Sequence, residues 1–113
     1  MSTVQAPVSD MLVTVKSREV QRGMLAEMRG DAGAASRHFL AAAHLEIVLS
    51  NEYAEAGERD LAIRSRVSAA SCFWRGRQKD QAISIFNSLS QDYPDEAASF
   101  EAEADDLKRN CPA

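Results

Sequence analysis

The stretch RGDAGAASRHF (residues 29–39) decides the fold, because its pattern returns in RGRQKDQAISIF (residues 75–86). Each copy begins with Arg-Gly, continues through a short polar segment, and then places an Ala four positions before a Phe. The two pairs are Ala35 with Phe39 and Ala82 with Phe86. A small residue lets two helices approach closely, and the large residue one turn later fills the space beside it. The repeat therefore predicts two similar helical hairpins, each turning near its Arg-Gly pair.

The composition favours an all-α protein with one domain over residues 1–113. Ala is abundant, β-branched residues are not clustered, and only 5 Gly and 3 Pro interrupt the chain, as expected for helices. The net charge of -4 gives no general attraction to phosphates, so we expect no nucleic acid partner. The N-terminal stretch lacks the basic start and apolar run of a signal peptide, and no window is long enough for a membrane span. We therefore expect a cytoplasmic protein.

The first hairpin is expected over about residues 8–56. Its first helix begins near Pro7, with Ser9 as the N-cap, and stops at Gly30, where a glycine suits the left-handed end of a helix. Asp31 is placed to cap the second helix. The end of that helix is open, because either Ser50-Asn51 or Gly57 could terminate it. Gly57 is the better C-cap, and the helical spacing of apolar residues continues beyond residue 51.

The second hairpin is expected over about residues 60–91, followed by a capping helix over about 94–109. Gly76 ends the third helix, and the fourth carries the apolar residues Ala82, Phe86 and Leu89 at helical spacing. Pro94 suits the first position of the fifth helix, where acidic residues follow it, and basic residues lie near its far end. The chain thus predicts about five antiparallel helices joined by short connections.

The second hairpin resembles the tetratricopeptide repeat, in which small and aromatic residues on a first helix precede Ala-x3-Phe on the second and then Pro. The matching residues are Ala70, Phe73, Ala82, Phe86, Leu89 and Pro94. The first hairpin matches through Gly23, Ala35, Phe39 and Ala42. The two copies are 47 residues apart, from Ala35 to Ala82, whereas the period of this family is about 34 residues. The resemblance therefore implies a stack of elongated, tetratricopeptide-like hairpins.

This resemblance implies a concave groove lined by the first helix of each hairpin. The residues carried over by position are Ser17, Val20, Met24, Glu27, Met28, Arg64, Val67, Ser71, Trp74 and Arg75. Met side chains adapt to varied partners, and Trp beside Arg is typical of an interface hot spot. The alternative is that Met24, Met28 and Trp74 are simply core residues, so the role of Trp74 stays open.

No constellation of residues points to catalysis, a cofactor or a metal ion. His38 and His44 are six positions apart on a helix and point to different faces, and no Cys, Asp or Glu completes a metal site at useful spacing, since Glu46 lies only two positions from His44. Cys72 lies in an apolar run and is expected to be buried, whereas Cys111 is expected in a frayed tail. The chain has no glycine-rich phosphate loop and no nucleophile elbow. We therefore expect no enzyme activity.

Two functions from different classes fit the sequence. The first is a noncatalytic interaction module, an adaptor or scaffold whose groove holds a peptide or helix of a protein partner. The second is a self-associating structural or regulatory subunit, in which the same groove is buried in a homodimer. A helical enzyme or ligand carrier would need a closed apolar cavity with converging polar groups.

Overall fold

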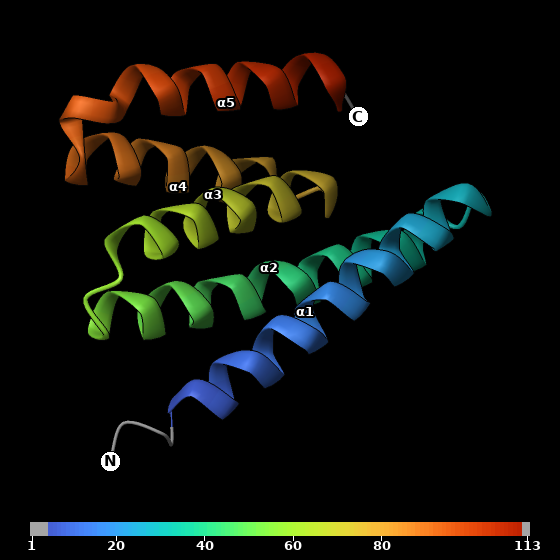
Figure 1. Cartoon of the computed structure of the whole chain (residues 1–113). Coiled ribbons are helices and arrows are strands. Elements are labelled where there is room, and N and C mark those ends of the chain that lie inside the picture. The colour runs from blue at the N-terminus through green and yellow to red at the C-terminus, as the bar shows by residue number, and fades with distance from the viewer. Residues whose placement is uncertain (1–4, 112–113) are drawn as a thin grey trace.

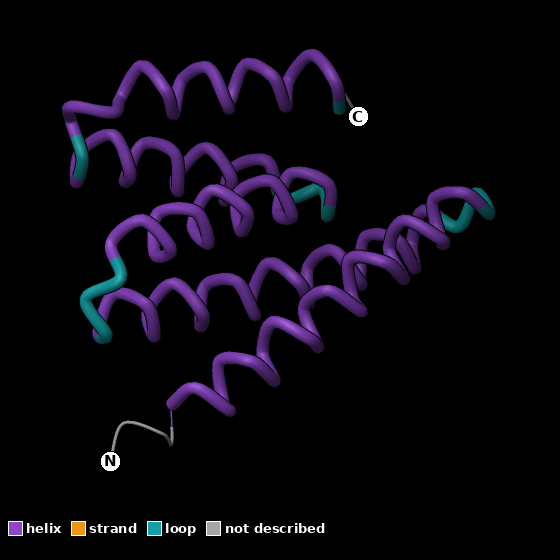
Figure 2. Tube along the Cα trace, viewed as in Figure 1, coloured by secondary structure: helices purple, strands orange, loops and turns teal. Residues whose placement is uncertain are grey.

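The computed structural model describes residues 5–111, and within this range every regular element is helical (Figure 2). The helices are α1 (Gln5–Met28), α2 (Ala32–Glu55), α3 (Arg59–Arg75), α4 (Lys79–Asp92) and α5 (Ala97–Asn110). One 3-10 turn, η2 (Pro94–Glu96), leads into α5. The prediction of an all-α fold with five helices is confirmed.

Each helix packs against the helix that follows it in the chain, and successive helices run antiparallel (Figure 1). α1 and α5 form the two edges of this array, with α2, α3 and α4 between them. The Cα trace measures 46 × 32 × 16 Å, so the array is thin. Because α1 lies at an edge of the array, its backbone packs against one described helix, α2, while α3 contacts it through side chains.

The turns that follow α1, α2 and α3 share one geometry. Each has three residues, and the middle one is left-handed: Gly30 (φ 75°), Gly57 (φ 76°) and Arg77 (φ 67°). The backbone N–H of the next residue donates to the carbonyl five positions earlier, at 2.8–2.9 Å in all three turns. This bond satisfies a carbonyl that the helix end would leave without a partner. The expected end of α2 at Gly57 is confirmed, and a turn at Ser50-Asn51 is wrong, because both residues lie inside α2.

The two Arg-Gly pairs therefore do not occupy equivalent positions in the structure. The residue that corresponds to Gly30, in the middle of the turn after α3, is Arg77 and not Gly76. Gly76 has an ordinary φ of -82°, so its backbone conformation does not require glycine. Its lack of a side chain matters for packing instead. A Cβ atom on Gly76 would lie 2.9 Å from both Cγ and Cδ2 of Leu40, closer than such atoms pack. Glycine is thus needed at position 76, where the end of α3 packs against α2. The left-handed position of this turn is occupied by Arg77.

Replacing Arg77 with glycine is expected to stabilise the protein by about 1 kcal/mol, because a left-handed conformation costs residues with a Cβ about this much. The matched control is Gly76→Ala, which overpacks Leu40 and is expected to destabilise by about 1–3 kcal/mol. Urea unfolding of both variants measures the two effects. A loss of stability in Arg77→Gly would mean that the arginine side chain makes contacts that outweigh its backbone strain.

The helix starts predicted from the sequence agree less well with the structure than the predicted helix ends. Asp31 caps α2 as predicted, with its Oδ1 accepting from the backbone N–H of Ala34 at 3.0 Å. The predicted N-cap at Ser9 is wrong, because α1 already begins at Gln5. Pro7 fits inside this first turn, where a missing N–H costs no helical hydrogen bond. Pro94 opens η2 as a helix start, and α5 proper begins three residues later at Ala97.

The small and large pairs predicted by the repeat are buried between helices. Ala35 and Phe39 form a cluster with Ala26 of α1, and Phe39 lies so close to α1 that a Cβ on Gly23 would be 2.9 Å from its ring. The main cluster joins the other four α-helices and includes Ala42, Phe73, Ala82, Phe86, Leu89 and Phe100. The interlock of alanine and phenylalanine in each hairpin is therefore confirmed.

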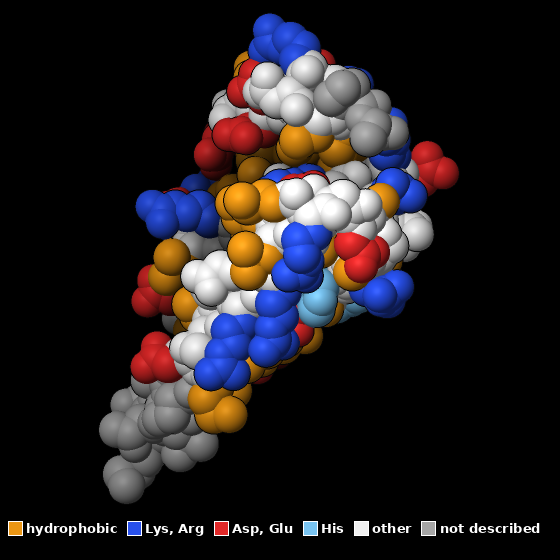
Figure 3. Space-filling model, turned by 90° about the vertical axis from the view of Figure 1, so that its right-hand side faces the viewer, with side chains coloured by type: hydrophobic (Ala, Val, Ile, Leu, Met, Phe, Trp, Pro, Cys, Tyr) orange, Lys and Arg blue, Asp and Glu red, His pale blue; other side chains and the backbone are white. Residues whose placement is uncertain are grey.

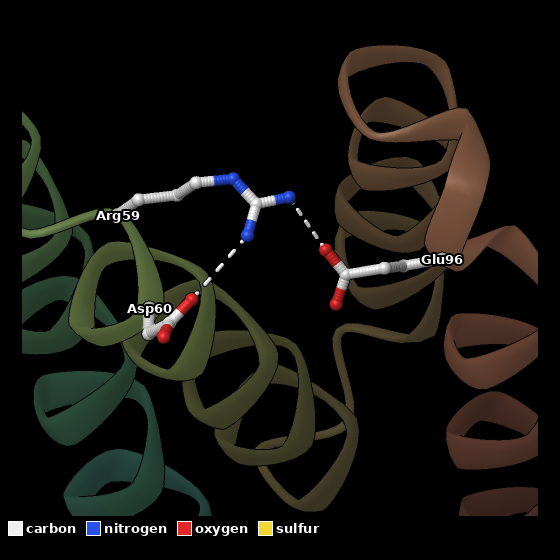
Figure 4. A network of polar contacts seen from close by, with 3 residues as sticks. All are labelled: Arg59, Asp60 and Glu96. Atoms are coloured by element: carbon white, nitrogen blue, oxygen red, sulfur yellow. Dashed lines mark hydrogen bonds and ion pairs between the residues drawn. The ribbon is translucent and has the colours of Figure 1, made fainter.

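A polar contact ties the start of α3 to the turn before α5 (Figure 4). The Arg59 guanidinium donates to Glu96 Oε2 at 2.7 Å and to Asp60 Oδ1 at 3.3 Å. Its Cζ atom also lies 4.9 Å from the centroid of the Tyr93 ring. Arg59 thereby connects the second hairpin with the capping helix at its exposed end.

Candidate interaction surface

The structure distributes the predicted groove residues over surfaces of different kinds. On α1, Met24 and Met28 are exposed, at 47% and 83%, and Val20 packs partly buried against the main core cluster. On α3, Val67 and Ser71 line a small pocket together with residues of α5, namely Glu103, Asp106, Leu107 and Asn110. The capping helix thus lies beside the part of α3 that was expected to face a partner.

Trp74 belongs to the core. Its side chain is 8% exposed, and its Nε1–H donates to the backbone carbonyl of Cys111 at 2.5 Å. The Lys79 ammonium lies 5.0 Å from the centroid of the indole ring. The residue after α5 therefore binds the N–H edge of the Trp74 ring. Of the two roles that the sequence left open for Trp74, a groove residue and a core residue, the structure shows the core residue.

Arg75 is engaged within the fold. Its Nη2 donates to Glu27 Oε1 at 2.8 Å, and its guanidinium lies 4.2 Å from the centroid of the Phe39 ring. This arginine thereby joins the end of α3 to the end of α1. Arg64, by contrast, is exposed and forms no ion pair with any described residue. Whether the predicted set binds a partner stays a prediction.

An open pocket of about 650 Å³ lies at the end of the array where three segments meet. The turn after α1, the turn after α3 and the end of α5 form its walls. Its lining includes Gly30, Ala32, Trp74, Arg75, Arg77 and Cys111. Figure 3 views this end of the molecule and shows Lys and Arg side chains gathered on it, with hydrophobic side chains next to them.

The exposed apolar surface is concentrated on α1. Among the described residues, ten large hydrophobic side chains are exposed, and seven of them lie on this helix: Val8, Met11, Val13, Val15, Met24, Leu25 and Met28. Isolated exposed hydrophobic residues are normal on a monomer, but a concentration on one element marks a candidate binding surface. Sequence reasoning named Met24 and Met28 and missed Met11 and Leu25, which are separated by arginines along the helix.

A buried ion pair lies where the first three helices meet. The Glu46 side chain on α2 is 5% exposed, and its Oε2 is 3.6 Å from the Lys16 Nζ of α1. Burial raises the pKa of Glu46, while the charge of Lys16 and, to a smaller extent, the hydroxyls of Ser65 and Ser68 on α3 oppose that rise. This group stabilises packing and lies away from the exposed surface of α1.

The two cysteines differ in environment, although less than expected. Cys72 is buried, and burial, helped by the nearby Glu46, raises the pKa of its thiol to about 11. The prediction that Cys111 lies in a frayed tail is wrong, because it is partly buried and its carbonyl accepts from Trp74. Both thiols are free.

In a variant with Cys111→Ser, the remaining Cys72 thiol is expected to react with a thiol reagent only at the rate at which the protein opens, because a buried thiol is shielded and protonated. In the matched Cys72→Ala variant, Cys111 reacts faster. Mass spectrometry of labelling in native buffer against time measures both rates. Rapid native labelling of Cys72 would contradict the orientation of α3.

In the described residues, the two histidines contact neighbouring helices. His38 Nδ1 and Glu19 Oε2 lie 2.6 Å apart, linking α2 with α1. The His44 ring meets the Phe73 ring edge-on, with 5.2 Å between their centroids. Over residues 5–111, no group of three or more His, Cys, Asp or Glu side chains is arranged to hold a metal ion. No helix in this range combines the length and apolar character needed to cross a membrane.

Over residues 5–111, the fold and these surfaces define an all-α protein of five sequentially packed antiparallel helices, with large hydrophobic side chains exposed on the edge helix α1. Neither models of known protein families, nor curated proteins, nor solved structures give a match to the chain.

Proposed function

We propose that this protein is a noncatalytic interaction module of tetratricopeptide-like architecture, acting as an adaptor or scaffold that binds a helix or peptide of another protein. The observation that carries the proposal is the concentration of exposed hydrophobic side chains on α1. A helix at the edge of a stack has one side without a neighbour, and in helical-repeat proteins such terminal elements normally present a polar outer face. α5 follows that rule with its acidic outer side, and α1 does not.

Methionines strengthen this proposal. Met11, Met24 and Met28 are 66%, 47% and 83% exposed, and an unbranched thioether adapts to partners of different shape. The binding surface proposed here is therefore α1, together with the α1 part of the groove expected from sequence, and Trp74 acts from within the core. The cytoplasmic location expected from sequence is part of the same proposal.

A photo-reactive amino acid in place of Leu25 tests this function in cells of the source organism. The matched control carries it in place of Gln81, an exposed residue of α4. Cross-linked partner proteins are expected from position 25, and not from position 81 or from position 25 in a variant that also carries Met28→Glu. Cross-links to a second copy alone would favour the self-associating subunit, and adducts from neither position would count against an interaction role for α1.

A further inference from the structure

A continuous stripe of exposed residues runs along α1 and ends at Arg29, the first residue of the turn that follows. Its residues follow a spacing of four and three positions, which places them on one side of a helix. We call this set the outer stripe, and it consists of Met11, Val15, Arg18, Arg22, Leu25 and Arg29. All six residues are exposed, with Met11 at 66%, Val15 at 42% and Leu25 at 51%.

The charge on this stripe has one sign. Three of its six residues are arginines, and none is acidic. Arg18 and Arg29 form no ion pair with any described residue. Among the described residues, Arg22 forms its ion pair with Glu19, at 3.6 Å and with its own side chain 57% exposed, a geometry that holds an arginine weakly. The stripe thus offers apolar side chains and arginines that are available for carboxylates.

From this arrangement we propose that the outer stripe binds an acidic amphipathic helix of another protein. The inference rests on the interaction role proposed above and specifies the chemistry of the partner. Apolar residues of that helix pack on Met11, Val15 and Leu25, in the manner of helices that lie against an amphipathic surface. Its Asp and Glu side chains pair with the arginines, whose planar guanidinium groups bind carboxylates through two parallel hydrogen bonds.

A second copy of this chain is a poor occupant of the stripe. In a parallel pair of α1 helices each arginine meets its own counterpart, and in an antiparallel pair centred on the stripe Arg18 of one copy meets Arg22 of the other. Like charges placed opposite each other across an interface are strongly unfavourable. The outer side of α5 is acidic, but its exposed residues include no large hydrophobic side chain to cover Met11 and Leu25.

A membrane surface also fits less well. A helix that lies in a lipid interface separates a wide apolar face from its basic face and commonly carries aromatic residues. On α1, arginines and apolar residues share one stripe, and the helix has no aromatic residue. The alternation of the two kinds of residue along one line favours a partner with side chains at matching positions.

The test is a selection of helical peptides from a randomised display library on the immobilised full chain. Selected peptides are expected to carry apolar residues at spacings of three and four with Asp or Glu among them. Arg18→Glu should weaken their binding more than about tenfold, because the attraction becomes a repulsion. Lys108→Glu, the same charge change on α5 at the opposite edge of the array, should leave it unchanged. A peptide with Lys in place of Glu should regain binding to the Arg18→Glu variant.

Each other outcome overturns the inference. Selected peptides without acidic residues, but lost on Leu25→Glu, would reject the acidic partner and leave the interaction role of α1 intact. No selected peptide that depends on α1 would remove both proposals. Binding to vesicles containing an anionic phospholipid, abolished by Arg18→Glu and unaccompanied by peptide selection, would assign the stripe to membranes. A dimer in sedimentation that Leu25→Glu dissociates would assign it to a second copy.

Discussion

Trp74→Ala is expected to destabilise the protein by about 3–5 kcal/mol, the range for removing a large aromatic side chain from a core. The indole is 8% exposed in the main cluster, so its removal leaves a cavity that the neighbouring helices only partly fill. The variant also loses the hydrogen bond that holds the carbonyl of Cys111. Chemical unfolding of the wild type and the variant, followed by circular dichroism, measures the difference.

Trp74→Phe is the matched control, because it keeps an aromatic ring in the core while it removes the indole N–H and only part of the ring volume. Its expected cost is about 1–2 kcal/mol, the penalty for leaving a polar partner unsatisfied. In both variants the Cys111 thiol should label faster, since the end of α5 loses its attachment. If Trp74→Ala keeps nearly full stability and instead weakens binding of a partner, Trp74 lies in a groove in solution and its core placement is wrong.

The hairpins could be predicted from sequence because their determinants are local. The pairs of Ala and Phe indicate both a helical spacing and a close approach of two helices. Gly30 and Gly57 end a helix and Asp31 caps one, each within one turn of its own position. The left-handed arginine at position 77 could not be predicted in this way. The glycine of this turn lies instead at position 76, where a Cβ would be too close to Leu40 on α2, and no local pattern reports a contact between residues 36 positions apart.

The candidate surface was predictable only in part, for a related reason. The resemblance placed Met24 and Met28 on the side of the expected groove, but it left open whether these side chains face the core or solvent. The position of α1 at the edge of the array decides this, and it is a property of the whole fold. Likewise, Trp74 beside Arg75 has the composition of a binding site, and its burial depends on α5 returning across α3.

The Lys16–Glu46 pair was not predicted from sequence, because its members lie 30 positions apart and a single glutamate in an apolar helix reads as a surface residue. In the structure it lies between α1 and α2 beside the serines of α3. A buried carboxylate is unfavourable unless its charge and its hydrogen bonds are all matched. The junction of the three helices therefore depends on Lys16 reaching Glu46.

Lys16→Met should consequently destabilise the protein by about 3 kcal/mol near neutral pH, the low end for breaking a buried pair, because the Lys16 side chain is 23% exposed. The folded-state pKa of Glu46 is already raised, so the stability due to its protonation is present below the unfolded pKa and is lost as pH rises through the folded pKa. Without Lys16 that folded pKa rises further, and the loss of stability should be larger at pH 8 than at pH 5.

Lys16→Met combined with Glu46→Met should recover most of the stability, since no buried charge remains. Arg22→Met, in contrast, removes only an exposed ion pair and should cost less than about 1 kcal/mol. Urea unfolding at both pH values measures all three variants, and an effect of Lys16→Met that is as small as that of Arg22→Met at pH 8 would show that Glu46 reaches water in solution.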